Sequence, residues 1–522
     1  MSINKKIISL VVGILFLSSL LAGCVEQQAD EQPAAQVPQE VVAGLGRDPV
    51  GARGAHPYLT RVFEQLVILD AEMKPRPGLA TSWEVSEDGR TWTIHLREGV
   101  KFHDGTPFNA ETAKFSLEWA TRVRPGLLGS IDRIEIVDDY TIKVIHSEPH
   151  APFLRSLFFA VMISPNAIDE DDRVIESIGT GPFKVEDYQP EDKLVLVRNE
   201  AYWGGLPKLE RITLRYIPEA TTRIMALEAG EIDMIIDTGG ILPEHAPVLK
   251  ANPEIEVMTI HGVVHHHIGF DTTTPPFDDV RTRKAISYAI DPESLVRYAL
   301  EGYGKVMNTP VPPLYKDWMH PDLLFEFSDK DKARKLLQEA GWADMDGDGI
   351  VEKDGEEFKV TMHLAGGWVG RWPYKTIAEI IQSDLREIGI AMDIDVVDTG
   401  LYREMMERGD VKMTLIPIAG VSPRSAVKDT FHSEGGMTVA INPPFFSNPR
   451  VDELTEAAMK ETDDSRAQRL LFEVQEIVAA EVLMIPLFEE LMINAVRDNI
   501  RGYEMHPWFV VNWEDIHVVS EK

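Results

Sequence analysis

The chain has 522 residues, a formal net charge of −33 at pH 7 and a single cysteine. This length exceeds what one hydrophobic core supports and predicts two or three domains. The acidic composition argues against nucleic acid and anionic lipid as partners, because both repel negative charge. One cysteine excludes disulfides within the chain.

The first 24 residues are typical of an export signal. Lys5 and Lys6 precede an apolar run over residues 7–21, and Ala22 and Gly23 come directly before Cys24. Positive charge, a short apolar segment and small residues are the pattern of a signal peptide. The small pair before the cysteine resembles a lipoprotein signal, and the resemblance implies cleavage there and lipid on Cys24. An uncleaved membrane anchor is the alternative interpretation.

Either interpretation places the rest of the chain outside the cytoplasmic membrane. Residues 25–41 are rich in Gln, Ala, Glu and Pro and have few large apolar side chains. Such a segment cannot bury enough surface to order itself, so a flexible tether is predicted. A strand over residues 41–45 follows, and then a glycine-containing loop that holds the candidate ligand contacts His56 and Tyr58.

Residues 83–96 alternate in a way that predicts a hairpin. Apolar side chains at 83 and 85, and again at 92, 94 and 96, flank a turn at 87–89. Asn109 is then expected to cap a helix.

The run from residue 260 to 291 carries four histidines and leads through Pro275-Pro276 into a helix. Side chains alternate faces in a strand, so His265 and His267 are expected to share one face and His266 the other. Two imidazoles on one face are candidate metal ligands or cleft-lining groups. The alternative is a polar strand without a ligand, since no zinc-type motif supports a metal.

Three features are predicted further along the chain. A helix is expected over residues 328–340, with Ser328 as its cap and Gly341 as its stop. The acidic loop that follows, with Asp344, Asp346 and Asp348, imitates part of a calcium loop. Position twelve of that loop is Gly355 instead of a bidentate Glu, so an acidic turn is favoured over Ca²⁺.

The third feature is the loop over residues 366–374. It offers Trp368, Arg371 and Trp372 as candidate ligand contacts, because aromatic rings beside an arginine suit stacking and carboxylate binding. Core packing of a tryptophan is the competing interpretation.

Several spaced motifs together resemble the extracellular solute-binding proteins of peptide and nickel ABC transporters, family 5. They are SWEVSEDGRTWTIHLREGVKFHDGTPFNAET, IGTGPFKV, VRNEAYWGG, IPEATTRIMALEAGEIDMI, PPFDDVRTRKAISYAID and AEIIQSDLREIGIAMDI. They cover nearly the whole chain after the tether. The resemblance implies an α/β, two-lobe periplasmic-binding-protein-like fold (type II, cluster C) with an extra subdomain in the first lobe.

The same resemblance implies the domain organisation and the partners. Lobe I is expected to comprise residues 42–82, 178–262 and 489–522, the extra subdomain 83–177, and lobe II 263–488. The chain would cross between lobes at residues 262–270 and return near 485–490. Partners would be the permease and ATPase subunits of an importer, with the binding protein itself monomeric.

The cargo is predicted from departures within the family. The peptide carriers' Tyr-Pro-Asp-Pro segment is missing from residues 420–436, although Asp429 is a possible substitute for its acidic residue. Nickel carriers bind a metal chelate through arginines, aromatic rings and a histidine. Arg124 matches one of those arginines, whereas residues 157–165 lack the second. The family's metal-touching histidine falls near Ala426, with His432 displaced from it.

His56 lies close to a cleft methionine of the nickel carriers, which suggests an imidazole on the opposite wall. With His265 and His267 it forms the predicted metal-ligand set. Imidazole binds Ni²⁺ well. The sequence therefore favours a carrier of nickel, as a small organic chelate, over an oligopeptide or dipeptide carrier. An enzyme is disfavoured, because no nucleophile elbow, phosphate loop or zincin motif is present.

Overall fold

The computed structural model describes residues 37–50, 61–420, 422–433 and 446–520. The chain divides into two units, Met1–Pro38 and Gln39–Lys522, and all features below belong to the second. The predicted lipidation site Cys24 and the loop residues His56 and Tyr58 lie outside the described residues. Within the described part of the chain, no helix has the length and apolar character needed to cross a membrane.

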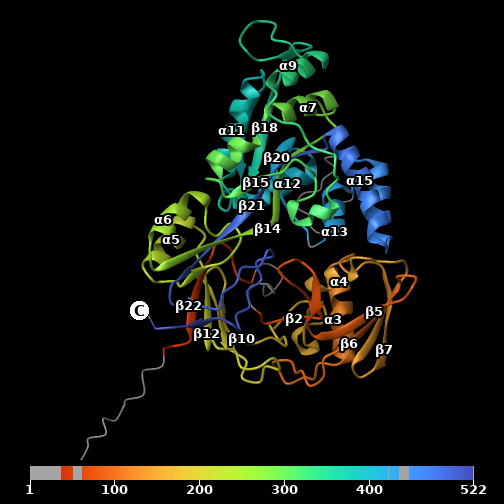
Figure 1. Cartoon of the computed structure of the whole chain (residues 1–522), viewed down its shortest axis with the longest axis vertical. Coiled ribbons are helices and arrows are strands. Elements are labelled where there is room, and N and C mark those ends of the chain that lie inside the picture. The colour runs from red at the N-terminus through yellow and green to blue at the C-terminus, as the bar shows by residue number, and fades with distance from the viewer. Residues whose placement is uncertain (1–36, 51–60, 421, 434–445, 521–522) are drawn as a thin grey trace, which may run out of the picture. The chain divides into compact units, whose positions relative to one another are not determined.

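An 11-stranded sheet organises the fold (Figure 1). Its order is β10-β11-β12-β1-β13-β21-β14-β20-β18-β19, and β15 pairs with β21. The bounds are β1 Glu40–Leu45, β10 Phe183–Gln189, β11 Lys193–Arg198, β12 Arg211–Tyr216, β13 Met234–Ile235, β14 Ile255–Phe270, β15 Gly304–Val306, β18 Lys359–Ala365, β19 Ala391–Val397, β20 Met413–Ala419 and β21 Met484–Arg497.

Two long antiparallel strands, β14 and β21, connect the two ends of this sheet. The first half of β14 and the last half of β21 pair in register from Ile255–Arg497 to His261–Leu491. The second half of β14 pairs with β20, from Val264 to Phe270. We therefore define the first lobe by β1 and β10–β13, and the second lobe by the elements between β14 and β21 along the chain.

Pairing between β14 and β21 is interrupted where the strands pass from one lobe to the other. His261 faces Leu491, but the next paired residue of β14 is His265, opposite Glu489. Extra residues on one strand make a β-bulge, which bends the ladder locally. The buried half of β14 runs from Gly262 to Phe270, which is the segment that the sequence predicts to cross between lobes.

A smaller four-stranded sheet, β5-β6-β8-β7, belongs to the extra subdomain (Figure 1). The predicted hairpin is its core: β5 (Ala80–Val85) and β6 (Thr91–Leu96) pair with Val85 opposite Trp92. Strands β7 (Ile131–Asp138) and β8 (Thr141–His146) complete the sheet. Helix α3 (Ala110–Val123) begins at Asn109, whose side chain forms the predicted cap with Thr112.

The second lobe contains helix α9 (Lys330–Glu339), and here the predicted cap is wrong. Asp329 is the cap, and its side chain accepts a hydrogen bond from the backbone N–H of Lys332. Ser328 instead has a positive φ of 59°, so it lies in the turn before the cap. Gly341, with a φ of 92°, ends the helix as expected.

The remaining elements are short strands and covering helices. They are β2 Glu64–Gln65, β3 Val67–Leu69, β4 Pro75–Pro77, β9 Val161–Met162, β16 Glu352–Lys353, β17 Glu356–Glu357, β22 Ile500–Arg501, β23 His517–Val518, α4 Phe153–Ser156, η1 Leu157–Phe159, η2 Pro165–Ala167, α5 Ala220–Glu228, η3 Pro243–His245, α6 Ala246–Ala251, α7 Val280–Ala289, α8 Pro292–Ser294, η4 Leu295–Ala299, η5 Pro313–Trp318, α10 Gly366–Val369, α11 Tyr374–Arg386, α12 Thr399–Arg408, α13 Pro423–Phe431, α14 Pro449–Lys460 and α15 Asp464–Glu481.

Candidate functional site

The histidine pair on β14 is the most distinctive polar group of the second lobe. The Nδ1 atom of His265 lies 2.6 Å from the Nε2 atom of His267, and both side chains are at most 1% exposed. The other ring nitrogens, His265 Nε2 and His267 Nδ1, have no hydrogen-bond partner among the described residues. Two imidazole rings, each with a nitrogen lone pair, are thus held side by side on one face of the sheet.

Burial sets the charge of this pair. Loss of hydration, reinforced by neighbouring histidines, lowers the pKa of His265 well below its usual value and that of His267 to about 3. Both imidazoles are therefore neutral near pH 7. Neutral imidazole is the form that ligates metals.

The opposite face of β14 carries an aromatic cluster. The ring of His266 stacks on Phe488 at 4.7 Å, meets Trp372 edge-on at 5.3 Å, and its Nδ1 is 2.8 Å from the hydroxyl of Tyr374. Trp372, at 5% exposure, donates its indole N–H to Glu490. Trp372 consequently lies on the side of the strand away from His265 and His267.

Glu490 is the buried acceptor at the centre of that cluster. It also accepts a 2.7 Å hydrogen bond from the hydroxyl of Thr238, a residue of the first lobe. Burial would raise the pKa of Glu490, but contacts with His266, Thr238 and Trp372 outweigh it and hold the pKa below its usual value. The carboxylate is thus charged and linked to both lobes.

Arg371 and Trp368, the two other candidate ligand contacts of the loop over residues 366–374, also contact protein groups. Arg371 donates from Nη2 to the backbone oxygen of Thr238 at 2.9 Å and lies over the ring of Trp372 at 4.7 Å. Trp368 is half-buried, with its ring 5.5 Å from that of Tyr402. A ligand role for Trp368, Arg371 and Trp372 stays a prediction.

Arg124 lies on the first lobe, in a second cation–aromatic group. It ends helix α3, and its guanidinium lies 5.7 Å from the ring centre of Phe159. The ring of Phe159 is 5.3 Å from Trp508, which stacks on Phe509 at 5.7 Å, and Arg47 lies over Phe509 at 4.9 Å. Two arginines thus flank a continuous row of aromatic rings.

The sequence does not reveal this row, because its members come from residues 47, 124, 159 and 508–509. No spacing rule connects segments so far apart. Arg124 alone was identifiable as a candidate ligand contact, because it matches an arginine of the nickel carriers. The structure therefore separates the predicted residues into an imidazole pair on β14, a loop group on the other face of that strand, and Arg124 on the first lobe.

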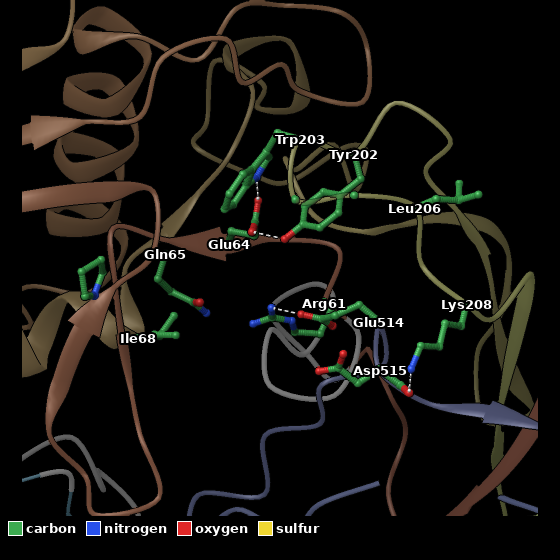
Figure 2. A pocket seen from close by; sticks show the side chains of 14 residues that line it. Arg61, Glu64, Gln65, Ile68, Tyr202, Trp203, Leu206, Lys208, Glu514 and Asp515 are labelled. Atoms are coloured by element: carbon green, nitrogen blue, oxygen red, sulfur yellow. Dashed lines mark hydrogen bonds and ion pairs between the residues drawn. The ribbon is translucent and has the colours of Figure 1, made fainter. Parts of the chain in front are cut away.

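A pocket of about 420 Å³ lies elsewhere in the first lobe (Figure 2). Its buried carboxylate, Glu64, accepts hydrogen bonds from Tyr202, Trp203 and Thr180 at 2.8–2.9 Å. Burial raises the pKa of Glu64, although the nearby Arg61 and these donors oppose the increase. The carboxylate thus has three donors within the protein, and it connects β2 to the loops that hold Thr180, Tyr202 and Trp203.

The acidic loop on the second lobe is an exposed turn. Carboxylate oxygens of Asp344, Asp346 and Asp348 lie within 4.8 Å of one another. Asp344 accepts hydrogen bonds from the backbone N–H groups of Gly347 and Gly349 at 2.7 and 3.1 Å. Its oxygens therefore already have hydrogen-bond partners within the loop.

The chain has two lobes joined by a pair of long strands, and different elements display aromatic, cationic and imidazole groups. This arrangement defines the class of solute-binding proteins. Residues 74–435 match the family described as bacterial extracellular solute-binding proteins, family 5 Middle. The chain belongs to this family. It is the substrate-binding component of an ABC importer, and its family consists of extracytoplasmic proteins that work with ABC permease and ATPase subunits.

Individual relatives agree with this assignment. The glutathione-binding protein GsiB of Escherichia coli O1:K1 is 30% identical over 507 residues, which covers 91% of this chain and 94% of the relative. NikA from Brucella suis, solved with Fe(III)-EDTA, gives a TM-score of 0.81 at 24% identity, over 92% of this chain and all of NikA.

NikZ from Campylobacter jejuni, solved with Ni(L-His), gives a TM-score of 0.79 at 21% identity, over 92% of this chain and 100% of NikZ. Identities this low establish the fold alone. The family and its fold confirm the predicted α/β two-lobe architecture. They also confirm that the protein is a non-enzymatic transport component.

Proposed function

We propose that the cargo is Ni²⁺ carried within a small organic chelate, and that His265 and His267 supply protein ligands to the metal. The observation that carries this proposal is the 2.6 Å approach of His265 Nδ1 to His267 Nε2 on one face of β14. A modest rotation of the rings would open this distance enough to admit a metal between the two nitrogens. Imidazole nitrogen is a preferred ligand of Ni²⁺.

The pair supplies only part of a coordination shell. Among the described residues, the single cluster of three or more His, Cys, Asp or Glu side chains with ligand spacing is the exposed Asp344 loop. A metal at His265 and His267 would therefore take its remaining ligands from a chelator. His56 lies outside the described residues and stays a predicted third ligand.

The chelator would suit the row of side chains described on the first lobe. This row consists of Arg124, Phe159, Trp508, Phe509 and Arg47. Guanidinium groups bind carboxylates through paired hydrogen bonds, and aromatic rings stack on planar groups. We place the chelator's carboxylates against this row. Because His265 and His267 are buried, loading would require the lobes to part, as hinge-type binding proteins do.

A short peptide such as glutathione is the second candidate. The relative named glutathione-binding protein is 30% identical across nearly the whole chain, which favours a thiol-bearing peptide. Asp429 on α13 supports it further, because burial raises the pKa of its carboxyl to about 7. A peptide ammonium beside Asp429 would restore the charged form of that carboxylate.

Titration calorimetry of the purified chain separates these candidates. The titrants are Ni²⁺ alone, Ni²⁺ with free histidine, glutathione, and a mixture of short peptides. Nickel transport predicts the tightest binding with Ni²⁺ plus histidine, and its loss in the His265→Ala, His267→Ala double variant. Tight binding of glutathione or peptide, unaffected by that double variant, would reject nickel.

We also propose that the protein is a lipid-anchored monomer. Cys24 follows the small pair Ala22 and Gly23 after a short apolar run, and lipid on its sulfur would retain the protein at the outer face of the cell membrane. Mass spectrometry of the protein purified from membranes tests this, with Cys24→Ser as the control. A mature protein that retains residues 1–23 without lipid would reject it.

A further inference from the structure

A seam of direct contacts joins the extra subdomain of the first lobe to the end of α14 in the second lobe. The backbone N–H of Ala151 donates to the carbonyl oxygen of Met459 at 3.0 Å. One residue further along α14, the ammonium of Lys460 lies 2.9 Å from a carboxylate oxygen of Glu148. These partners are more than 300 residues apart in sequence.

The hairpin turn of the subdomain reaches the same seam. A Cβ added at Gly89 would lie 2.5 Å from the side-chain methyl of Thr462, just beyond α14. That glycine has a φ of 69°, so the turn itself also requires it. The close approach shows that the turn packs against the second lobe.

The covalent connections between lobes are the two long strands β14 and β21, so the seam is a separate, non-covalent connection. We propose that the seam is a clasp that stabilises the closed arrangement of the lobes, with the Glu148–Lys460 ion pair as its adjustable part. Opening the lobes would break the ion pair and the Ala151–Met459 hydrogen bond together.

The clasp is weak enough to be reversible. The side chains of Glu148 and Lys460 are 47% and 42% exposed, and exposed ion pairs shift an equilibrium by only about 1.4- to 5-fold. A cavity of about 510 Å³ borders the seam and keeps it open to water. Salt therefore screens the pair, and the proportion of closed molecules should fall as ionic strength rises.

The charges around the ion pair favour the observed pairing. Lys428 and Glu456 line the same cavity. The Nε2 atom of His432 lies 3.2 Å from a carboxylate oxygen of Glu456, and the side chain of Glu456 is 53% exposed. Reversing Glu148 to lysine would place three positive side chains, at 148, 428 and 460, on one cavity.

The experiment measures lobe separation in the free, full-length chain. Fluorescent dyes are attached at Glu98→Cys in the subdomain, beyond the end of β6 that is away from the seam, and at Lys335→Cys in the second lobe, in a Cys24→Ser background; both chosen positions are exposed. Energy transfer is then compared for wild type, Glu148→Lys, Lys460→Glu, and the double charge exchange.

Each single reversal should lower the closed-to-open ratio by about 2- to 5-fold, and the double exchange should restore it. The matched control is Glu326 and Lys332, an ion pair of 2.6 Å within the second lobe whose side chains are 64% and 44% exposed. Reversing either control residue should leave lobe separation unchanged.

Unchanged energy transfer in both single variants, or failure of the double exchange to restore it, would overturn the clasp. The measurement needs no cargo. A failed nickel titration would therefore leave this test unaffected, and a failed clasp would leave the cargo question unaffected.

Discussion

The imidazole rings of His265 and His267 form a hydrogen-bonded pair on one face of β14, with 2.6 Å between Nδ1 of the first and Nε2 of the second. Such a pair holds one ring nitrogen as donor and the other as acceptor. The strand fixes both Cα positions, because β20 pairs with it on one side and β21 on the other.

Replacement of either His265 or His267 by Ala should lower the affinity for Ni²⁺ with free histidine by about tenfold or more, because one protein ligand of the metal is lost. Calorimetry measures this change. The control is His261→Ala on the same strand, whose half-exposed ring contacts Glu489 at 2.7 Å. An equal loss in the control would contradict a specific role for the pair.

Arg124→Ala should weaken binding of a carboxylate-bearing chelate by about tenfold, since one charge-assisted contact is lost. Arg122→Ala is the matched control, because Arg122 is on the same helix but forms its ion pair with Asp172 at 2.8 Å. Dissociation constants for the nickel–histidine complex measure both effects. Equal weakening by the two variants would point to a general charge effect.

Glu64→Ala should destabilise the fold by about 2–4 kcal/mol, because the donors of Tyr202, Trp203 and Thr180 lose their shared acceptor. Urea unfolding measures the change. Tyr202→Phe removes one donor and should cost about 1 kcal/mol. If Glu64→Ala lowered the free energy of unfolding no more than Tyr202→Phe does, water would be replacing the carboxylate as the acceptor.

The buried histidines of the extra subdomain should make the protein sensitive to acid. Burial lowers the pKa of His146 to about 4 and that of His150 to about 3, below the ordinary value of 6.5. As pH falls below about 6.5, the unfolded chain takes up protons that the folded chain refuses. Stability should therefore decrease from near pH 7 to about pH 4.

Near pH 5, each of these histidines should account for roughly 2 kcal/mol of lost stability. Urea unfolding of His146→Leu and His150→Leu, compared near pH 7 and pH 5, should show a smaller pH effect than wild type. His517→Leu, near the end of the chain, is the control. An undiminished pH effect in both subdomain variants would mean that other groups cause the acid sensitivity.

Much of the local structure was predictable because short-range signals determine it. The turn at residues 87–89 and the alternation around it predict the β5–β6 hairpin, and Asn109 predicts the start of α3. Ser328 misled the prediction of α9, since Ser and Asp are both good caps and stand next to each other. Only the backbone conformation shows that Asp329 is the one used.

The arrangement of the candidate site residues was predictable only where they are neighbours in sequence. Alternation along a strand places His265 and His267 together, and the structure has them so. Alternation cannot show that Trp372 would pack on the face of β14 that carries His266. That contact depends on how a loop about 100 residues later in the chain folds back. Phe159, Trp508 and Arg47 meet through long-range topology for the same reason.

The interruption between His261 and His265 in the β14–β21 ladder has a consequence for unloading. The histidine pair comes after the interruption, in the half of β14 that pairs with β20. If the molecule bends at this point, the two rings keep their neighbours in the second lobe, while the aromatic row around Trp508 withdraws with the first. A metal held by the pair would then remain on the second lobe, so the permease would have to draw it from that half.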